Sequence, residues 1–386
     1  MSRRKIVSID LMGHLCLIPD PRQRKVKHPL INILFIGVIA SLCGVDDFVG
    51  MAAFCRARRK WFSKYLDLSN GIPSHDRINA VFAMLKPEFV ETMFRSWVQA
   101  LQLEFRETQI AIDGKSLRSS FDKASGKSAL HMVHAWGKAN GMCLGQVITD
   151  GKSNEITAIP KLLESLEIKG CLVTIDAMGC QKEIAQKILD KGGDYCLCVK
   201  GNQKNLHADI SKFVAARFEA KLSKGTVRRH ETEEKGHGRE EKRYNYVFGI
   251  PKGFREASKW PGLKAIGVVI NETKRDGKMT NQVRYYILSR KMRAKEFGQA
   301  VRGHWGIENQ LHWQLDVSYQ EDKCRVRQGD ADANLAIPRR LTLNMLNANK
   351  TENWESKINN FLRGGIWPPV RWSLLDNGLG RVCPGG

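Results

Sequence analysis

The sequence lacks the patterns that would assign it to several common protein classes. Its ten cysteines contain no Cys-x-x-Cys pair, so a structural zinc site is not expected, and reduced thiols in a cytoplasm fit better. Its glycines form neither the P-loop pattern GxxxxGK(S/T) nor GxGxxG, so nucleotide hydrolysis and dinucleotide binding have no support. No apolar run is long enough to span a bilayer, and no apolar signal segment follows the basic start. We therefore expect a cytoplasmic protein without membrane contact.

Acidic residues are scarce relative to basic ones. Lys and Arg number 62 against 40 Asp and Glu, which gives a formal net charge of +22. Such an excess attracts a polyanion through counterion release, and nucleic acid is the usual partner. A basic enzyme or a ribosome-associated factor without DNA chemistry is the alternative. With 386 residues, of which 42% are hydrophobic, the chain can form two or three domains with substantial cores.

Residues 1 to about 105 are predicted to form an all-α domain that binds DNA. Apolar residues in HPLINILFIGVIASLCGV recur at helical spacing, FVGMAAFCRARRKWFSKYL predicts a second helix, and a cap at Ser74 precedes a third. The second helix carries a basic stretch, which suits contact with a DNA backbone or, alternatively, forms a solvated face. Its members include Arg56, Arg58, Arg59 and Lys60.

Residues 106 to 350 are predicted to form a mixed α/β domain. The patterns follow the order β-β-β-α-β-α-β, with a hairpin signal at Asn140-Gly141 between the second and third strands. Three antiparallel strands followed by alternating units imply a mixed sheet with flanking helices. A β-rich insertion is expected at about 205–290, with KGHGREEKRYNYVFGI as one of its strands, and a long helix follows from about Ala294 to Val317. The tail at 351–386 matches no regular pattern.

Three carboxylates stand where phosphodiester chemistry would need them. Asp113 lies within the first predicted strand, Asp176 ends a later one, and Glu308 lies on the late helix. Neighbouring parallel strands can bring both aspartates to the same edge of a sheet, and a helix can add the glutamate, so that oxygen ligands hold two hard cations. Taken singly, each acid is more typical of a turn or a helix cap. Together, in so basic a chain, they favour metal-dependent chemistry on nucleic acid.

Longer motifs around these acids closely resemble one protein family. AIDGKSLR at 111–118, VTIDAMGCQ at 173–181, CVKGNQ at 198–203, GHGREEKR at 236–243 and RGHWGIENQLHWQLDVSYQEDKCR at 302–325 are similar to segments of the ISAs-type insertion-sequence transposases, a DDE group that includes the H-repeat-associated proteins. The similarity covers about residues 10–350. It implies an RNase H-like core and Mg²⁺-dependent strand cleavage and joining at element ends. Asp113, Asp176 and Glu308 match the catalytic and metal-binding acids of this family.

The resemblance also sets the expected cofactor and partners. Two Mg²⁺ ions are expected, with Mn²⁺ as a substitute, and double-stranded DNA is expected both as element ends and as target. Because the reaction cleaves two ends, it implies a homodimer in the synapse. A bacterial cytoplasm, in association with the nucleoid, is the expected location.

Further residues are candidates for contact with DNA. Many relatives in the wider superfamily carry an Arg four residues before the glutamate and a Lys seven residues after it; here these positions hold His304 and Leu315, while Arg302 lies two residues further upstream. The roles of Arg302, His304 and His312 toward phosphates therefore stay open. Lys115, two residues after Asp113, can steady a scissile phosphate or lie in solvent. Lys200, in the CVKGNQ motif, completes the set of DNA-binding candidates.

Several of these residues have alternative interpretations. His304, Glu308 and His312 recur at four-residue spacing, which is also compatible with a zinc site. Gly236 and Gly238 around His237 either allow backbone to approach DNA or form a hairpin turn. Three tryptophans either stack on splayed bases or fill the core; they are Trp136, Trp305 and Trp313.

The function expected from these observations is a DNA transposase. Water attacks the phosphodiester at an element end, and the released 3′-hydroxyl then attacks target DNA in line. The tail after about Asn349 differs from the basic ending usual in the family. Two alternatives therefore remain: a degenerate or domesticated DNA-binding protein without strand transfer, and a metal-dependent nuclease or resolvase on the same core.

Overall fold

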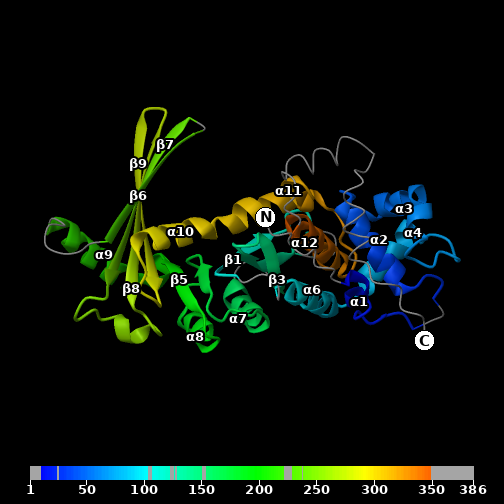
Figure 1. Cartoon of the computed structure of the whole chain (residues 1–386), viewed down its shortest axis with the longest axis horizontal. Coiled ribbons are helices and arrows are strands. Elements are labelled where there is room, and N and C mark those ends of the chain that lie inside the picture. Colours follow the sequence, from blue (N-terminus) through cyan, green and yellow to red (C-terminus); the bar gives the residue numbers. More distant parts are fainter. Residues whose placement is uncertain are drawn as a thin grey trace, which may run out of the picture.

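The computed structural model describes residues 10–23, 26–102, 107–121, 126, 128–149, 154–220, 228–236 and 238–348 (Figure 1). The unassigned tail at 351–386 and His237 therefore lie outside the described residues. Within these ranges, no helix combines the length and the apolar character needed to cross a membrane.

The N-terminal part of the chain is helical, as predicted. Its helices are α1 (Leu11–Leu15), α2 (Leu30–Leu42), α3 (Phe48–Ala57), α4 (Arg59–Phe62), α5 (His75–Met84) and α6 (Pro87–Gln102). Twelve of the thirteen residues of α2 are buried, which explains its broad apolar stripe. The predicted cap at Ser74 is confirmed, since its Oγ accepts a hydrogen bond from the Arg77 amide at 3.2 Å. The predicted second helix is broken at Arg58, which separates α3 from α4.

The middle of the chain forms the predicted order of strands and helices. The elements are β1 (Gln109–Ser116), β2 (His131–Gly137), β3 (Met142–Thr149), α7 (Glu155–Ser165), β4 (Leu172–Ile175), α8 (Lys182–Asp190) and β5 (Asp194–Val199). β1, β2 and β3 pair antiparallel, whereas β1, β4 and β5 pair parallel. The prediction of a mixed sheet with helices on its faces is confirmed.

The predicted β-rich insertion continues this sheet. After α9 (Lys204–Glu219) come four antiparallel strands, β6 (Arg228–Gly236), β7 (Arg239–Gly249), β8 (Ala265–Arg275) and β9 (Lys278–Leu288), which we call the β-arm. β9 pairs with β5, so one nine-stranded sheet has the order β3-β2-β1-β4-β5-β9-β8-β7-β6. The segment predicted as one strand at 235–250 belongs to two strands instead, because β6 ends at Gly236 and β7 begins at Arg239. In Figure 1 the β-arm projects away from the N-terminal helices.

The late helix is not continuous, which corrects the prediction of one helix over 294–317. It consists of α10 (Ala294–His304), a π-helix (Ile307–His312) and α11 (Trp313–Val317). A short 3-10 helix (Glu321–Lys323) and α12 (Ala331–Ala348) follow. α10 runs from the β-arm toward the centre of the molecule, and α12 lies between β3 and the N-terminal helices (Figure 1).

The helical N-terminal part and the sheet share one hydrophobic core. α12 packs against α2, α5 and α6 on one side and against β3 on the other. One cluster of buried side chains extends from Leu11 in α1 to Leu343 in α12. The two parts are therefore held together by α12, and the boundary at about residue 105 stays a prediction.

Candidate active site

Strand pairing in the middle of the sheet aligns the two predicted aspartates. Asp113 lies in β1, and Asp176 directly follows Ile175, the last residue of β4. These parallel strands pair Ile112 with Ile175, so the next step of the same register sets Asp113 beside Asp176. Aligned residues of neighbouring strands point to the same face of a sheet. The register thus brings the two acids to neighbouring positions, and their role as a pair stays a prediction.

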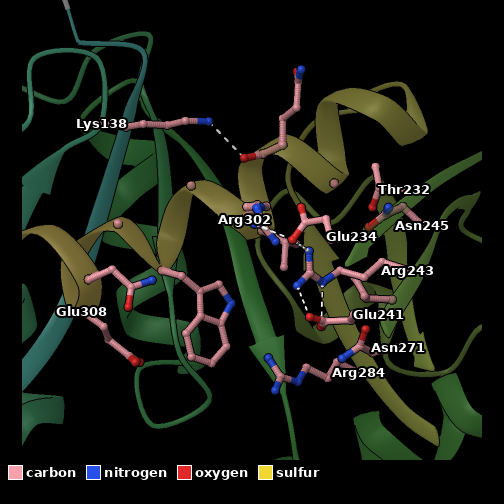
Figure 2. A pocket seen from close by; sticks show the side chains of 18 of the residues that line it. Lys138, Thr232, Glu234, Glu241, Arg243, Asn245, Asn271, Arg284, Arg302 and Glu308 are labelled. Atoms are coloured by element: carbon pink, nitrogen blue, oxygen red, sulfur yellow. Dashed lines mark hydrogen bonds and ion pairs between the residues drawn. The ribbon is translucent and has the colours of Figure 1, made fainter. Parts of the chain in front are cut away.

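Glu308 lies in the π-helix that interrupts the late helix. A single π-helical turn inside an α-helix is rare and is frequent at functional sites, because the extra residue re-aims neighbouring side chains. The Glu308 side chain is exposed and borders a cavity (Figure 2).

The three carboxylates interact electrostatically. Burial raises the pKa of Asp113 to about 7, and the negative charges of Asp176 and Glu308 add to this shift. Burial also raises the pKa of Glu308, an effect that Arg284 opposes and Asp176 reinforces. Acids that disfavour each other's charge in this way are stabilised in the ionised form by a nearby cation. Their oxygen ligands suit a hard divalent ion such as Mg²⁺.

The ligands do not close around an ion in this conformation. Among the residues that the structure describes, no three His, Cys, Asp or Glu side chains form a group that could hold a metal. This applies equally to the three carboxylates and to the alternative zinc set of His304, Glu308 and His312. The chemistry of the oxygen donors and their mutual repulsion therefore carry the fit to a cation, and the roles of Asp113, Asp176 and Glu308 stay a prediction.

The two histidines of the late helix flank the aspartates as neutral rings. His304 Nδ1 lies 3.1 Å from Thr174 Oγ1, and burial lowers its pKa to about 4. His312 Nδ1 lies 3.8 Å from Asp113 Oδ2. Burial, followed by the positive charges of Lys115 and Arg340, lowers the pKa of His312 to about 3. Neither ring brings positive charge to a phosphate, and the predicted phosphate contacts stay a prediction.

Lys115 is buried and paired with two acids, which corrects the solvent-exposed alternative, whereas its contact with a phosphate stays a prediction. Its Nζ lies 2.5 Å from Asp316 Oδ1 and 3.2 Å from Asp322 Oδ1, and its side chain is 6% exposed. Two carboxylates neutralise the ammonium, so in this conformation it does not lie in solvent. Lys115 instead ties β1 to the segment that follows Glu308.

A cavity of about 1070 Å³ lies beside Glu308 and is walled by α10 and the β-arm (Figure 2). Cations outnumber acids in its lining. The cations are Lys138, Arg239, Arg243, Arg284 and Arg302, and the acids are Glu234, Glu241 and Glu308. A concave surface of this size with excess positive charge suits a polyanion.

Ion pairs hold the arginines of this cavity in place. Arg302 Nη2 lies 2.8 Å from Glu234 Oε2, and Arg243 Nη2 lies 2.7 Å from Glu241 Oε2. Arg302 is nevertheless 57% exposed, so the predicted DNA contact at this residue is sterically open. Sequence reasoning placed Arg243 in the GHGREEKR motif but missed its place in this cavity, because that place depends on the pairing of β6 with β7.

The tryptophans divide between the core and the surface. Trp136 is fully buried, whereas Trp305 and Trp313 are 37% and 53% exposed. The guanidinium carbon of Arg284 lies 5.0 Å from the centre of the Trp305 ring. Core burial thus accounts for Trp136, and base stacking by the other two stays a prediction.

The remaining DNA-binding candidates lie away from this cavity. Arg56, Arg59 and Lys60 are exposed on α3 and α4, Arg58 is half-buried, and Lys200 is exposed after β5. None of them lines the cavity. In Figure 1, α3 and α4 lie at the opposite end of the molecule from the β-arm. Gly236 ends β6 and Gly238, with a positive φ of 73°, directly precedes β7, as expected for the hairpin alternative.

A buried group next to Asp113 carried no sequence signal. His131 Nε2 lies 2.7 Å from Glu155 Oε1, and His131 Nδ1 lies 2.7 Å from Ser116 Oγ. Gly114 permits this approach, since a Cβ there would lie 2.8 Å from His131 Nε2 and closer still to the Glu155 carboxylate. The charge of Glu155 contributes to the raised pKa of Asp113.

Comparison with known proteins identifies the family. Residues 12–98 match the DDE_Tnp_1-associated family, and residues 104–345 match the family described as Transposase DDE domain. "Putative transposase YncI" of Escherichia coli O157:H7 is 44% identical over 342 residues, which cover 87% of each chain. "H repeat-associated putative transposase YhhI" of Escherichia coli K12 is 40% identical over 385 residues, which cover 97% of this chain and 98% of the relative.

A solved structure and a shorter relative are also similar. A piggyBac transposase synaptic complex with hairpin DNA has a TM-score of 0.37 and 11% identity, and the match covers 97% of this chain and 82% of that one. "Inactive transposase YbfQ" of Escherichia coli K12 is 35% identical over 77 residues, 20% of this chain and 92% of the relative. The family match over residues 104–345 and the identity with full-length relatives lead to one conclusion: this chain belongs to the DDE transposase family.

Proposed function

We propose that this protein cleaves DNA strands at the ends of an insertion sequence and joins them to target DNA. The observation that carries the proposal is the β1–β4 register, which aligns Asp113 with Asp176 at the sheet edge that Glu308 also influences. Carboxylates from two central strands and a late helix are the ligand set that a metal-dependent polynucleotidyl transfer requires.

We take strands β3-β2-β1-β4-β5 to be an RNase H-like core. This is supported by three antiparallel strands joined to a parallel set, with the acids on β1 and directly after β4. The β-arm then lies on one edge of this core and the N-terminal helices pack against the other through α12.

Asp113, Asp176 and Glu308 would hold a pair of Mg²⁺ ions, or Mn²⁺ in their place, as the family resemblance implies. When bound, such ions supply Lewis-acid activation of the attacking oxygen and stabilise the leaving oxygen. The protein's own contribution is to orient the acids: β1 and β4 fix the two aspartates in register, and the Met178 amide donates a hydrogen bond to Asp176 Oδ1 at 2.9 Å.

The cavity beside Glu308 would receive DNA near the point of cleavage. Arg284, Arg302 and Lys138 line it and can neutralise phosphates. The exposed basic residues Arg56 and Lys60 would contact DNA further away. Because each reaction involves two element ends, we expect a homodimer on DNA, in the cytoplasm and at the nucleoid.

The test is incubation with labelled element ends, target DNA and Mg²⁺. We expect joined products from the unaltered protein. Asp113→Asn should reduce cleavage by at least about 10³-fold while DNA binding is unchanged, because the acid is needed for the chemistry and not for phosphate contact. Asp190→Asn, an exposed aspartate at the end of α8, is the matched control and should retain activity.

Each other outcome points to a different function. Bound but intact DNA would indicate a DNA-binding protein without strand transfer. Cleavage without joining would indicate a nuclease. Loss of both binding and cleavage in Asp113→Asn, with lowered thermal stability, would argue for misfolding and against a metal-site role.

A further inference from the structure

A chain of side-chain contacts, polar except for one edge-to-face contact between two histidine rings, connects α12 to Asp113. Arg340, fully buried on α12, binds Glu321 with both ends of its guanidinium: Nη1 lies 2.5 Å from Oε1 and Nη2 lies 3.1 Å from Oε2. Its Nε lies 3.1 Å from His134 Nε2. The ring centre of His134 lies 5.3 Å from that of His312, whose Nδ1 is 3.8 Å from Asp113 Oδ2.

The hydrogen-bond chemistry permits one arrangement of these groups. A guanidinium has donors only, so Nε2 of His134 must accept, and the proton of this neutral ring sits on Nδ1. Burial, followed by the charge of Arg340, lowers the pKa of His134. Burial alone would raise the pKa of Glu321, but the Arg340 and Arg339 guanidiniums lower it below its usual value, so the carboxylate is ionised. The Arg340–Glu321 pair thus fixes the position of the His134 ring, against which the His312 ring packs.

A second ion pair holds the same segment from the other side. Lys115 lies on β1 two residues beyond Asp113, and its Nζ binds Asp316 of α11 and Asp322 of the 3-10 helix. The segment 307–323, which begins with the π-helix carrying Glu308, is therefore fastened to β1 by Lys115 and to α12 by Arg340.

Buried ion pairs of this kind contribute little net stability, because their desolvation opposes their mutual attraction. Desolvating a guanidinium and a carboxylate costs several kcal/mol, and packed apolar side chains of similar volume often stabilise a core as well or better. What a bidentate pair adds is a fixed distance and angle between the two elements that it joins. Arg340 fixes α12 against the 3-10 helix that follows the Glu308 segment. Lys115 fixes β1, which carries Asp113, against α11 and the same 3-10 helix.

We propose that Arg340 and Lys115 are positioning residues that set the spacing between Asp113 and Glu308. Arg340 acts through Glu321, His134 and His312, and Lys115 acts through Asp316 and Asp322. The inference rests on the proposed function, because the spacing matters only where the two acids share divalent cations. Outer contacts of this kind commonly change metal affinity 10- to 100-fold when they are lost.

The experiment compares two neighbouring arginines of α12 in the full-length protein. Arg340→Lys keeps the positive charge but loses the bidentate fork and the contact with His134. Arg339→Lys is the matched control: Arg339 is equally inaccessible, its Nη1 is 3.7 Å from Glu321, and its Nη2 donates instead to the carbonyl of Asp46. The readouts are Mn²⁺ binding by electron paramagnetic resonance, affinity for an element end without metal, and thermal unfolding.

We expect Arg340→Lys to weaken Mn²⁺ binding about tenfold with unchanged DNA affinity. Arg339→Lys should stay within about twofold of the unaltered protein in Mn²⁺ binding, even if both variants lose similar thermal stability. If Arg340→Lys does not fold, Lys115→Gln decides, and we expect the same loss of Mn²⁺ affinity from it.

The positioning role is overturned if the folded variants lower the melting temperature but bind Mn²⁺ as the unaltered protein does. Asp113→Asn separates this result from failure of the proposed function. If that variant also binds Mn²⁺ normally, the metal site itself is wrongly assigned. If it binds Mn²⁺ weakly while Arg340→Lys and Lys115→Gln bind it normally, only the positioning role is refuted.

Discussion

Replacing Gly114 by alanine tests how closely the buried group beside Asp113 is packed. A Cβ at this position would lie 2.8 Å from His131 Nε2 and would overlap the Glu155 carboxylate. Neither side chain can withdraw freely, because they are hydrogen-bonded to each other at 2.7 Å and both are buried. Overpacking of this kind costs about 1–3 kcal/mol, and breaking a buried hydrogen bond to a charged group costs a similar amount.

We therefore expect Gly114→Ala to lower the free energy of unfolding by about 2 kcal/mol. Chemical denaturation of Gly114→Ala, Glu155→Ala and the double variant measures whether this loss of stability arises from overlap with the Glu155 side chain. If it does, Gly114→Ala lowers the free energy of unfolding by at least about 1 kcal/mol less when Glu155 is already alanine. Gly201→Ala is the control, since its Cβ would meet no atom within 4 Å, and we expect a change below about 0.5 kcal/mol. Equal costs of Gly114→Ala in both backgrounds would refute the reasoning.

Two further predictions concern stability. Burial raises the pKa of Glu91 from its ordinary 4.5 to about 7, so this residue's contribution to stability is fully present below pH 4.5 and is lost as pH rises toward 7. Glu91→Gln should therefore be more stable than the unaltered protein at pH 8 but not at pH 4.5. We expect a difference of about 2 kcal/mol at pH 8, after allowing for solvent screening of this half-buried group. Thermal unfolding of both proteins between these pH values checks it, and a difference in stability that does not change with pH would contradict it. Asn344→Ala should cost about 2–3 kcal/mol in denaturant titrations, because the Asn344 amide pairs with both the N–H and the carbonyl of Cys143 at 2.8 and 2.7 Å. A loss below about 0.5 kcal/mol would show that water replaces it.

The central part of the fold was predictable because its signals are local. Short apolar runs mark both β1 and β4, so the positions of Asp113 and Asp176 on or after strands follow from short windows of sequence. The hairpin signal at Asn140-Gly141 was equally local, and the structure places it between β2 and β3, with a positive φ of 64° at Gly141. Motif resemblance then connected these acids to Glu308 without any knowledge of the sheet.

The features that sequence reasoning missed depend on contacts between distant segments. The partners of Lys115, Asp316 and Asp322, lie 201 and 207 residues later in the chain, so no local pattern connects them. α12 was not predicted because Pro338 interrupts its pattern and because Arg339 and Arg340, normally surface residues, are buried in it. The π-helix at Glu308 has no periodic signature of its own, so the pattern reads as one helix.

The nine-stranded order leaves two outermost strands, and the chain protects them by different means. β6 carries an exposed charged residue at every second position, and these charges discourage another chain from adding a strand there. The residues are Arg229, Glu231, Glu233 and Lys235. β3 is apolar and is covered by α12. The side-chain amide of Asn344 pairs with the backbone N–H and carbonyl of Cys143, the groups with which a tenth strand would otherwise pair. Detachment of α12 would therefore do more than loosen the core. It would expose an unpaired backbone edge to which another chain can add a strand, and it would thereby favour self-association.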